Sequence, residues 1–145
     1  MKRIILSLAA LIMAAGTALA DNDKPITVDQ LPATARQFIS TYFSGVKVSL
    51  AKMDTEIFDK SYEVVFTDGN KVEFNSKGEW KDVDCKFTQV PEGIIPPQIK
   101  NYVAANYKDM KIVKIDRNKR DYEVELSNGL ELKFDLKFNL IDIDN

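Results

Sequence analysis

The chain has 145 residues, no histidine, a single cysteine and a formal net charge of −2. Binding to nucleic-acid phosphates requires concentrated positive charge, so a mildly acidic chain excludes nucleic acid as a partner class. Without histidine the Ser-His and Cys-His nucleophile pairs are absent, and the usual zinc ligand sets are not available. The six glycines are scattered and form no phosphate-binding loop. We therefore predict a non-enzymatic protein without a cofactor; a catalytic carboxylate pair stays open but has no supporting motif.

Residues 1–20 have the three parts of a secretory signal peptide in order. Lys2 and Arg3 give the positive start, a largely apolar run of about a dozen residues follows, and Ala18-Leu19-Ala20 is a small-x-small cleavage site. The apolar run is too short to span a hydrocarbon core of about 30 Å as a helix. We predict cleavage after Ala20, a periplasmic or secreted mature chain of residues 21–145 with a net charge of −4, and no membrane insertion after cleavage.

Two stretches with helical periodicity follow, and each opens on an apolar residue and a proline. The openings are Leu31-Pro32 and Ile95-Pro96, and a proline is tolerated in the first turn of a helix. Apolar side chains then recur at i, i+3, i+4, i+7 and i+8, with one exception at Asn106, which gives each helix one apolar face. These positions are Ala35, Phe38, Ile39, Tyr42 and Phe43 in the first stretch, and Ile99, Tyr102, Val103, Asn106 and Tyr107 in the second.

After each helix the sequence indicates strands, and the two halves of the chain can be aligned. Residues 62–67 match residues 122–127, and the following Asp-Gly and Asn-Gly pairs are strong hairpin turns because they accept positive φ. A second turn, Asn75-Ser76-Lys77-Gly78, aligns with Asp135-Leu136-Lys137-Phe138, which lacks the glycine. We expect that turn to be built differently.

The pattern predicts an α+β fold made of a tandem repeat. Each unit, about 27–87 and 90–144, would be a helix followed by an antiparallel meander of about four strands. An apolar helix stripe and an apolar sheet face bury each other, so we expect both helices on one face of the sheet. Each unit alone is small, so we expect the two to share a core or a continuous sheet within a single mature domain, residues 21–145.

The leader, the Leu-Pro helix opening, the paired Tyr-Glu-Val strands and the Gly78-Glu79-Trp80 stretch resemble the PepSY-like domain proteins. These are small exported bacterial proteins whose fold is similar to that of the β-lactamase inhibitor proteins. The resemblance covers about residues 27–144 and departs from the repeat at Phe138 and Leu140. It implies binding of a protein through an open sheet face, and the family name implies an inhibitor, but the resemblance names no target.

Strict alternation along the final strand of the first unit places Trp80, Asp82 and Asp84 on one face, with Val83 on the other. If Val83 faces the helix, Trp80 points to the open face, where tryptophan is a typical interface anchor. The alternative, equally favoured, is that Trp80 packs against the core. The same register places further residues on the open face. They are Glu63, Val65, Lys71 and Glu73 in the first unit, and Glu123, Glu125, Glu131, Lys133 and Leu140 in the second.

The favoured function is therefore an exported binding protein that covers a protein or peptide partner with its open sheet face. The residues expected at that interface are Trp80, Glu63, Val65, Glu73, Asp82, Leu140, Glu125 and Lys133. The alternative is a small-ligand or calcium-binding protein whose ligands would be Asp82, Asp84, Asp142 and Asp144. A structural subunit of an envelope assembly is a third alternative.

Cys85 is the only cysteine and cannot form an intramolecular disulfide. We expect it to be a buried small apolar residue, with an intermolecular disulfide as the alternative.

Overall fold

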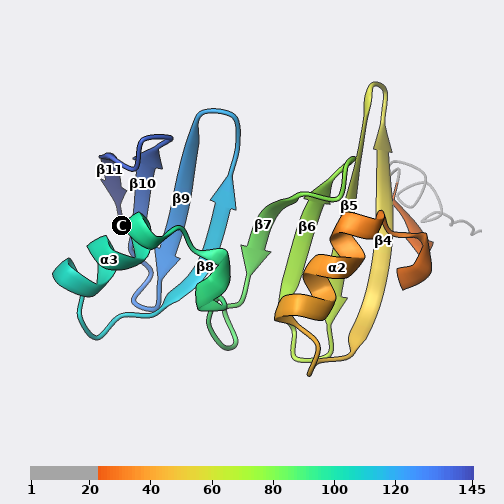
Figure 1. Ribbon diagram of the computed structural model, residues 1–145, viewed down its shortest axis with the longest axis horizontal. Helices are drawn as coiled ribbons and strands as arrows, with labels where there is room; N and C mark the ends of the chain where they lie inside the picture. Colours follow the sequence, from red (N-terminus) through yellow and green to blue (C-terminus); the bar gives the residue numbers. More distant parts are fainter. Residues whose placement is uncertain (1–22) are drawn as a thin grey trace, which may run out of the picture.

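The computed structural model describes residues 23–145 (Figure 1). The predicted signal peptide, residues 1–20, and its cleavage after Ala20 lie outside this range. Two α-helices, α2 (Ala33–Tyr42) and α3 (Pro97–Asn106), accompany two short 3-10 helices, η1 (Val28–Gln30) and η2 (Glu92–Ile94). The strands are β3 (Asp23–Ile26), β4 (Val48–Glu56), β5 (Asp59–Phe66), β6 (Lys71–Asn75), β7 (Trp80–Asp84), β8 (Ile112–Arg117), β9 (Asp121–Leu126), β10 (Glu131–Asp135) and β11 (Leu140–Asp144).

All nine strands form one continuous antiparallel sheet, in the order β11-β10-β9-β8-β7-β6-β5-β4-β3. The predicted fold class, a tandem repeat of a helix plus a meander of about four strands, is therefore wrong. The protein is mostly β, with only two α-helices in the described chain. β7 and β8 are hydrogen-bonded neighbours, so no sheet edge separates 27–87 from 90–144, and β3 adds a strand that the pattern did not predict.

A row of apolar residues crosses the sheet on the face that the helices cover. Val72 is paired with Val83, Val83 with Ile115, and Ile115 with Val124, and all four side chains are completely or almost completely buried. The row joins the two halves into one hydrophobic core. Continuity of the core across β7 and β8 explains why this chain forms a single sheet.

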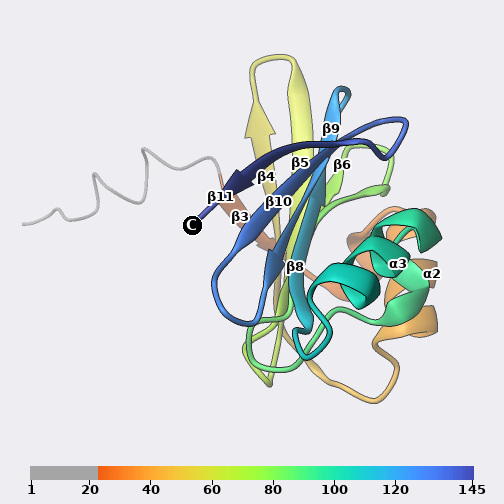
Figure 2. The same cartoon turned by 90° about the vertical axis from the view of Figure 1, so that its left-hand side faces the viewer.

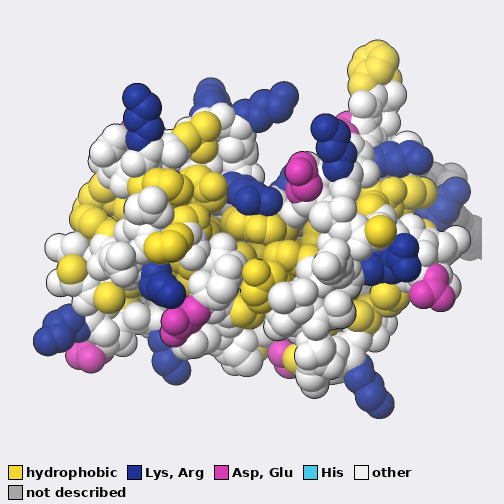
Figure 3. Space-filling model, in the orientation of Figure 1, with side chains coloured by type: hydrophobic (Ala, Val, Ile, Leu, Met, Phe, Trp, Pro, Cys, Tyr) yellow, Lys and Arg dark blue, Asp and Glu magenta, His cyan; other side chains and the backbone are white. Residues whose placement is uncertain are grey.

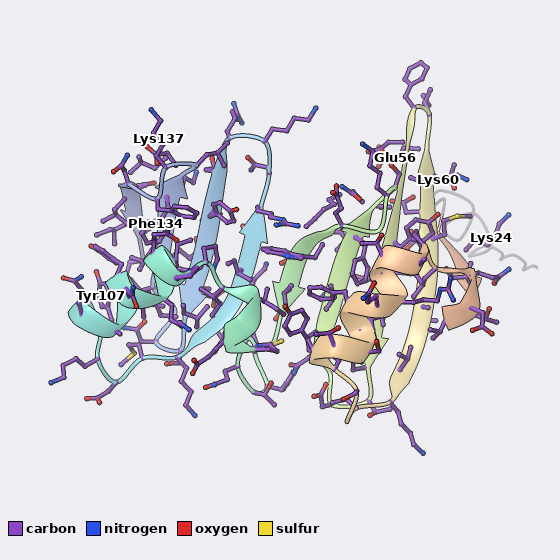
Figure 4. All side chains as sticks on the ribbon, viewed as in Figure 1. Lys24, Glu56, Lys60, Tyr107, Phe134 and Lys137 are labelled. Atoms are coloured by element: carbon purple, nitrogen blue, oxygen red, sulfur yellow. The ribbon has the colours of Figure 1, made fainter. Side chains whose placement is uncertain are left out.

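Both α-helices lie on the same face of the sheet, and the other face is not covered by either helix (Figure 2). Each has ten residues, too few to be stable alone in water, so packing on the sheet must stabilise them. Phe38 of α2 meets Phe74 edge-on at 5.5 Å, and Tyr102 of α3 meets Phe134 in the same way at 5.5 Å. Figure 4 labels Phe134 next to α3.

The turns after β6 and β10 have the same hydrogen bonds, although only the first contains glycine. Asn75 N–H donates to the Glu79 carbonyl, and Asp135 N–H donates to the Asn139 carbonyl in the same way. Gly78 has φ +84°, and Phe138 takes φ +68° in its place. The expectation of a different turn is wrong, because Phe138 adopts the left-handed conformation and its ring stacks on Tyr122 at 5.4 Å.

We expect Gly78→Ala to lower the free energy of unfolding by about 2–4 kcal/mol, since it adds both backbone strain and a clash. A Cβ at Gly78 would lie 2.9 Å from the Ala35 nitrogen and from Pro32 Cβ, at the start of α2. Gly129→Ala is the matched control, because Gly129 also has positive φ but no atom within 4 Å. It should lower the free energy by only about 1–2 kcal/mol. Equal losses in urea unfolding would contradict the close approach of this turn to α2.

The Cys85 side chain is completely buried and free. Burial, together with the nearby Asp68 and Asp84 carboxylates, raises the pKa of its thiol to about 12. A buried thiol that stays protonated is a poor nucleophile. Its position agrees with a small apolar core residue and gives no support to an intermolecular disulfide.

Candidate functional site

Five carboxylates from five adjacent strands form a row across the open face of the sheet. Each is paired directly with the next, in the order Glu63, Glu73, Asp82, Asp116 and Glu123. The strands contribute one residue each, from β5 to β9, because the alternation that buries the apolar row on the helix face places these half-buried positions on the other. We call these five residues the acidic row.

The acidic row is long for a single small ligand. Neighbouring strands lie about 4.8 Å apart, so the row extends over roughly 19 Å. Lysines lie at both ends: Lys52 is paired with Glu63 and Lys133 with Glu123. The Lys52 ammonium is 3.3 Å from the Glu63 carboxylate. At the centre the nearest ion pair is longer, with Lys114 Nζ 4.0 Å from Asp82 Oδ2.

Like charges directly opposite one another destabilise a sheet. At the centre of the acidic row, burial and neighbouring carboxylates together raise the pKa values of three carboxyl groups. Burial raises the pKa of Asp116 to about 6, and the Asp82 and Glu123 carboxylates contribute to the rise. Burial also raises the pKa of Asp82, although the nearby Lys114 ammonium lowers it. The pKa of Glu123 is raised as well, and burial is again the largest cause. Asp82 Oδ1 is buried and accepts no hydrogen bond from the described residues.

Two shallow hollows flank the centre of the acidic row. The first is lined by Lys52, Ser61, Glu63 and Glu73, together with Asp23 and Asp54. The second is lined by Lys114, Asp116, Glu123, Glu125 and Glu131, with Val124. Both linings contain more acidic than basic side chains, so the open face offers a negative surface on either side of β7.

Six of the predicted interface residues lie on this open face, and two do not. The six are Glu63, Val65, Glu73, Asp82, Glu125 and Lys133. Trp80 is paired with Phe74, and Leu140 with Phe134, because a β-bulge precedes each pair. The bulges add one residue to each strand, at Lys81 and Ile141, and so turn Trp80 and Leu140 to the helix side.

Trp80 is partly buried and packs against the hydrophobic core. This placement agrees with the core alternative, and strict alternation of Trp80 with Asp82 and Asp84 is wrong because of the bulge. The Arg117 guanidinium carbon lies 3.8 Å from the centroid of the indole ring. The open face therefore lacks the aromatic anchor that the sequence suggested.

The four aspartates proposed as calcium ligands are not brought together. Asp82 and Asp84 lie on β7, whereas Asp142 and Asp144 lie on β11, four strands away and roughly 19 Å apart. Calcium–oxygen distances are about 2.3–2.6 Å, so these four cannot share one ion. Among residues 23–145 no group of three or more His, Cys, Asp or Glu side chains is placed to hold a metal.

Sequence reasoning missed Asp116 and Arg117. Both lie on β8, and their roles depend on the pairing of β8 with β7, which no local pattern reveals. The alternation of Lys114 and Asp116 with Ile115 was the available signal, since it marks a strand with one buried and one polar face.

The molecule is a two-layer protein: one long antiparallel sheet has two helices on one face and a polar, acidic opposite face. The chain belongs to the PepSY-like family, because the family described as "Putative beta-lactamase-inhibitor-like, PepSY-like" matches residues 60–142. The resemblance inferred from the sequence is thus confirmed. The match includes all five positions of the acidic row.

Three solved structures are similar over almost their whole length. A putative calcium-regulated periplasmic protein of Bacteroides thetaiotaomicron is 63% identical, with a TM-score of 0.85, covering 87% of this chain and 99% of that one. A putative periplasmic protein of the DUF2874 family from Bacteroides vulgatus is 60% identical, with the same TM-score and coverage. A second Bacteroides vulgatus protein, described as periplasmic and of unknown function, is 42% identical, with a TM-score of 0.81, covering 85% and 99%.

No curated protein matches the chain. In the part of the chain that the structure describes, no helix has the length and apolar character needed to cross a membrane.

Proposed function

We propose that this chain is a periplasmic, non-enzymatic binding protein that holds a cationic protein segment on its open sheet face. The observation that carries the proposal is the acidic row, whose five carboxylates are set opposite one another at a cost in stability. Groups that destabilise a fold are expected at functional sites. The similar Bacteroides proteins are described as putative periplasmic proteins, which supports an extracytoplasmic partner.

The length of the acidic row favours a ligand with several charges. A single cation uses oxygens within about 2.6 Å, whereas the row offers carboxylates over roughly 19 Å. Lysine or arginine side chains along a protein segment can reach several of these carboxylates at once. The negative face would also steer such a partner before contact, and that attraction weakens as salt is added. If the partner is an enzyme, covering its basic surface would inhibit it sterically.

Octalysine is the defined probe for this proposal, with octaglutamate as the charge-reversed control. We expect octalysine to bind the protein in calorimetric titration, and the affinity to fall steeply between 50 mM and 200 mM salt. Octaglutamate should produce no binding heat. The matched control variant Asp29→Asn/Asp109→Asn removes two exposed carboxylates outside the open face and should bind octalysine as the parent does. No binding by the parent at low salt would contradict the proposal.

Calcium is a second candidate ligand, and a specific observation favours it. The Bacteroides thetaiotaomicron protein at 63% identity is described as calcium-regulated. Asp82 and Asp116 are directly paired, and Asp82 Oδ1 has no hydrogen-bond donor among the described residues. Calcium is bound by carboxylate oxygens together with carbonyl oxygens and water molecules, and these two aspartates would supply the carboxylates. A rise in Tm with calcium chloride, but not with sodium chloride of equal ionic strength, would support this candidate.

A further inference from the structure

A second surface feature lies where β7 and β8 separate. These strands are paired only over Asp82–Asp84 and Lys114–Asp116. Beyond the last pair, the start of β7 and the end of β8 border a hollow of about 450 Å³, which also reaches the β4–β5 hairpin. Figure 3 shows the surface notched between the two halves of the molecule, with hydrophobic side chains visible in the depression. Pockets of this size are typical of small-molecule sites.

Arg117 is held in a fixed position at this hollow. Its guanidinium stacks on the Trp80 ring at 3.8 Å, and its Nε donates a hydrogen bond of 2.9 Å to the Trp80 carbonyl. The two terminal amino groups make no hydrogen bond or ion pair with any of residues 23–145. A guanidinium with a fixed plane and two free amino groups has the geometry that binds a carboxylate or phosphate through two parallel hydrogen bonds.

The charges around the hollow also favour an anion. Lys81 and Lys119 line it together with Arg117, and none of the three takes part in the ion pairs formed within residues 23–145. Two carboxylates also line the hollow, so its lining has an excess of one positive charge, and each carboxylate accepts a hydrogen bond from a neutral donor. Glu79 Oε1 accepts a hydrogen bond of 2.9 Å from Asn75 Nδ2, and Asp59 Oδ1 accepts one of 2.8 Å from the Lys60 amide. Three cations that form no ion pair with the described residues thus meet at one hollow of an acidic protein.

We propose that this hollow is a binding site for a small molecule or peptide end that carries an oxyanion, either a carboxylate or a phosphate. The two free amino groups of the Arg117 guanidinium donate hydrogen bonds to the oxyanion. Lys81 and Lys119 add positive charge, and the remaining volume of the hollow holds the rest of the ligand. This site is separate from the acidic row, because its side chains lie beyond the paired part of β7 and β8 and its ligand has the opposite charge.

Trp80 is the only tryptophan of the chain, so its fluorescence reports directly on this site. The probes are inorganic phosphate and the tripeptide Ala-Ala-Ala, with the tripeptide amide as a control that lacks the carboxylate. At constant ionic strength we expect phosphate or the free tripeptide to change Trp80 emission in a saturable way. Which of the two saturates at lower concentration distinguishes phosphate from carboxylate as the preferred group. The tripeptide amide should give no saturable change.

Arg117→Gln should weaken anion binding at least tenfold. Arg117→Lys should also weaken it, because lysine keeps the charge but lacks the planar guanidinium that donates two parallel hydrogen bonds. Lys119 lies in an exposed loop, so Lys119→Gln does not disturb the core, and we expect it to weaken anion binding about two- to threefold. Lys137→Gln is the control, since Lys137 lies on the distant β10–β11 turn (Figure 4) and should leave binding unchanged. Unchanged affinity in both Arg117→Gln and Lys119→Gln, or no saturable change in the parent, would overturn the proposal.

Discussion

The Asp82→Asn/Asp116→Asn protein is expected to unfold at a higher temperature than the parent at pH 8 and to lose most of its affinity for octalysine. Asparagine keeps the shape of each side chain and removes two adjacent negative charges from the centre of the acidic row. The repulsion among Glu73, Asp82, Asp116 and Glu123 is thereby reduced, and so is the cost of burying charge. Stability and binding should therefore change in opposite directions.

The gain in stability should depend on pH in a defined direction. Asp116 has a pKa of about 6 in the folded protein against an ordinary value of 3.8, so the native state binds its proton more tightly than the unfolded state does. Asp116 thus favours folding below about pH 4, and this contribution is lost as the pH rises through 6. The difference corresponds to at most about 3 kcal/mol, which solvent screening at this half-buried site reduces to about 1–2 kcal/mol.

We therefore expect Tm to rise by roughly 3–8 °C at pH 8 and to match the parent near pH 4. Octalysine binding at pH 7.5 and low salt should weaken at least tenfold. The control Asp29→Asn/Asp109→Asn has the same net charge, and neither property should change in it. A double variant that is destabilised at pH 8, or that binds octalysine as tightly as the control, would show that the acidic row has a structural role instead.

The second large effect is expected from Ile115→Ala at the centre of the sheet. Ile115 is completely buried and lies between Val83 of β7 and Val124 of β9. Removing three buried carbons there should lower the free energy of unfolding by about 3–4 kcal/mol, because a cavity is left in the core. Since the two halves share this core, the whole sheet should lose stability together.

Trp80 lies in the first half of the chain and Ile115 in the second, so two spectroscopic probes can test this cooperativity. In urea, the transition followed by Trp80 fluorescence and that followed by far-UV circular dichroism should shift by the same amount. Ile57→Ala at the highly exposed tip of the β4–β5 hairpin is the control and should change stability by less than about 0.5 kcal/mol. A Trp80 transition that stays in place while the dichroism transition shifts would indicate two independent units.

Periodicity in the sequence indicates both helices and the buried faces of most strands, because these depend on local alternation. Val64, Val72 and Phe74 face the core as their spacing suggests, and so do Ala35 and Ile39 of α2. The small size of each unit indicated a shared core or a continuous sheet, but the strands that join the two halves were not predictable in this way. Pairing of β7 with β8 is a contact between residues about 30 positions apart, which no local pattern indicates.

The candidate site, like the fold, could be predicted from the sequence only where local alternation determines it. Glu63, Glu73 and Asp82 could be placed on one face from alternation, but Asp116 joins them only through the β7–β8 pairing. The bulges that turn Trp80 and Leu140 toward the helices leave no clear mark in the sequence, because one extra residue in a strand changes no local composition. A tryptophan near two aspartates therefore suggested an aromatic anchor that the open face does not have.

The most direct test of the acidic row is an NMR titration of the isotopically labelled protein with octalysine, followed through its amide signals. We predict that the shifted amides cluster on β5 to β9 around Glu63, Glu73, Asp82, Asp116 and Glu123, and that Asp82→Asn/Asp116→Asn removes most of these shifts. Shifts centred on the helices, or spread evenly over the surface and unchanged in the double variant, would contradict binding at the open face.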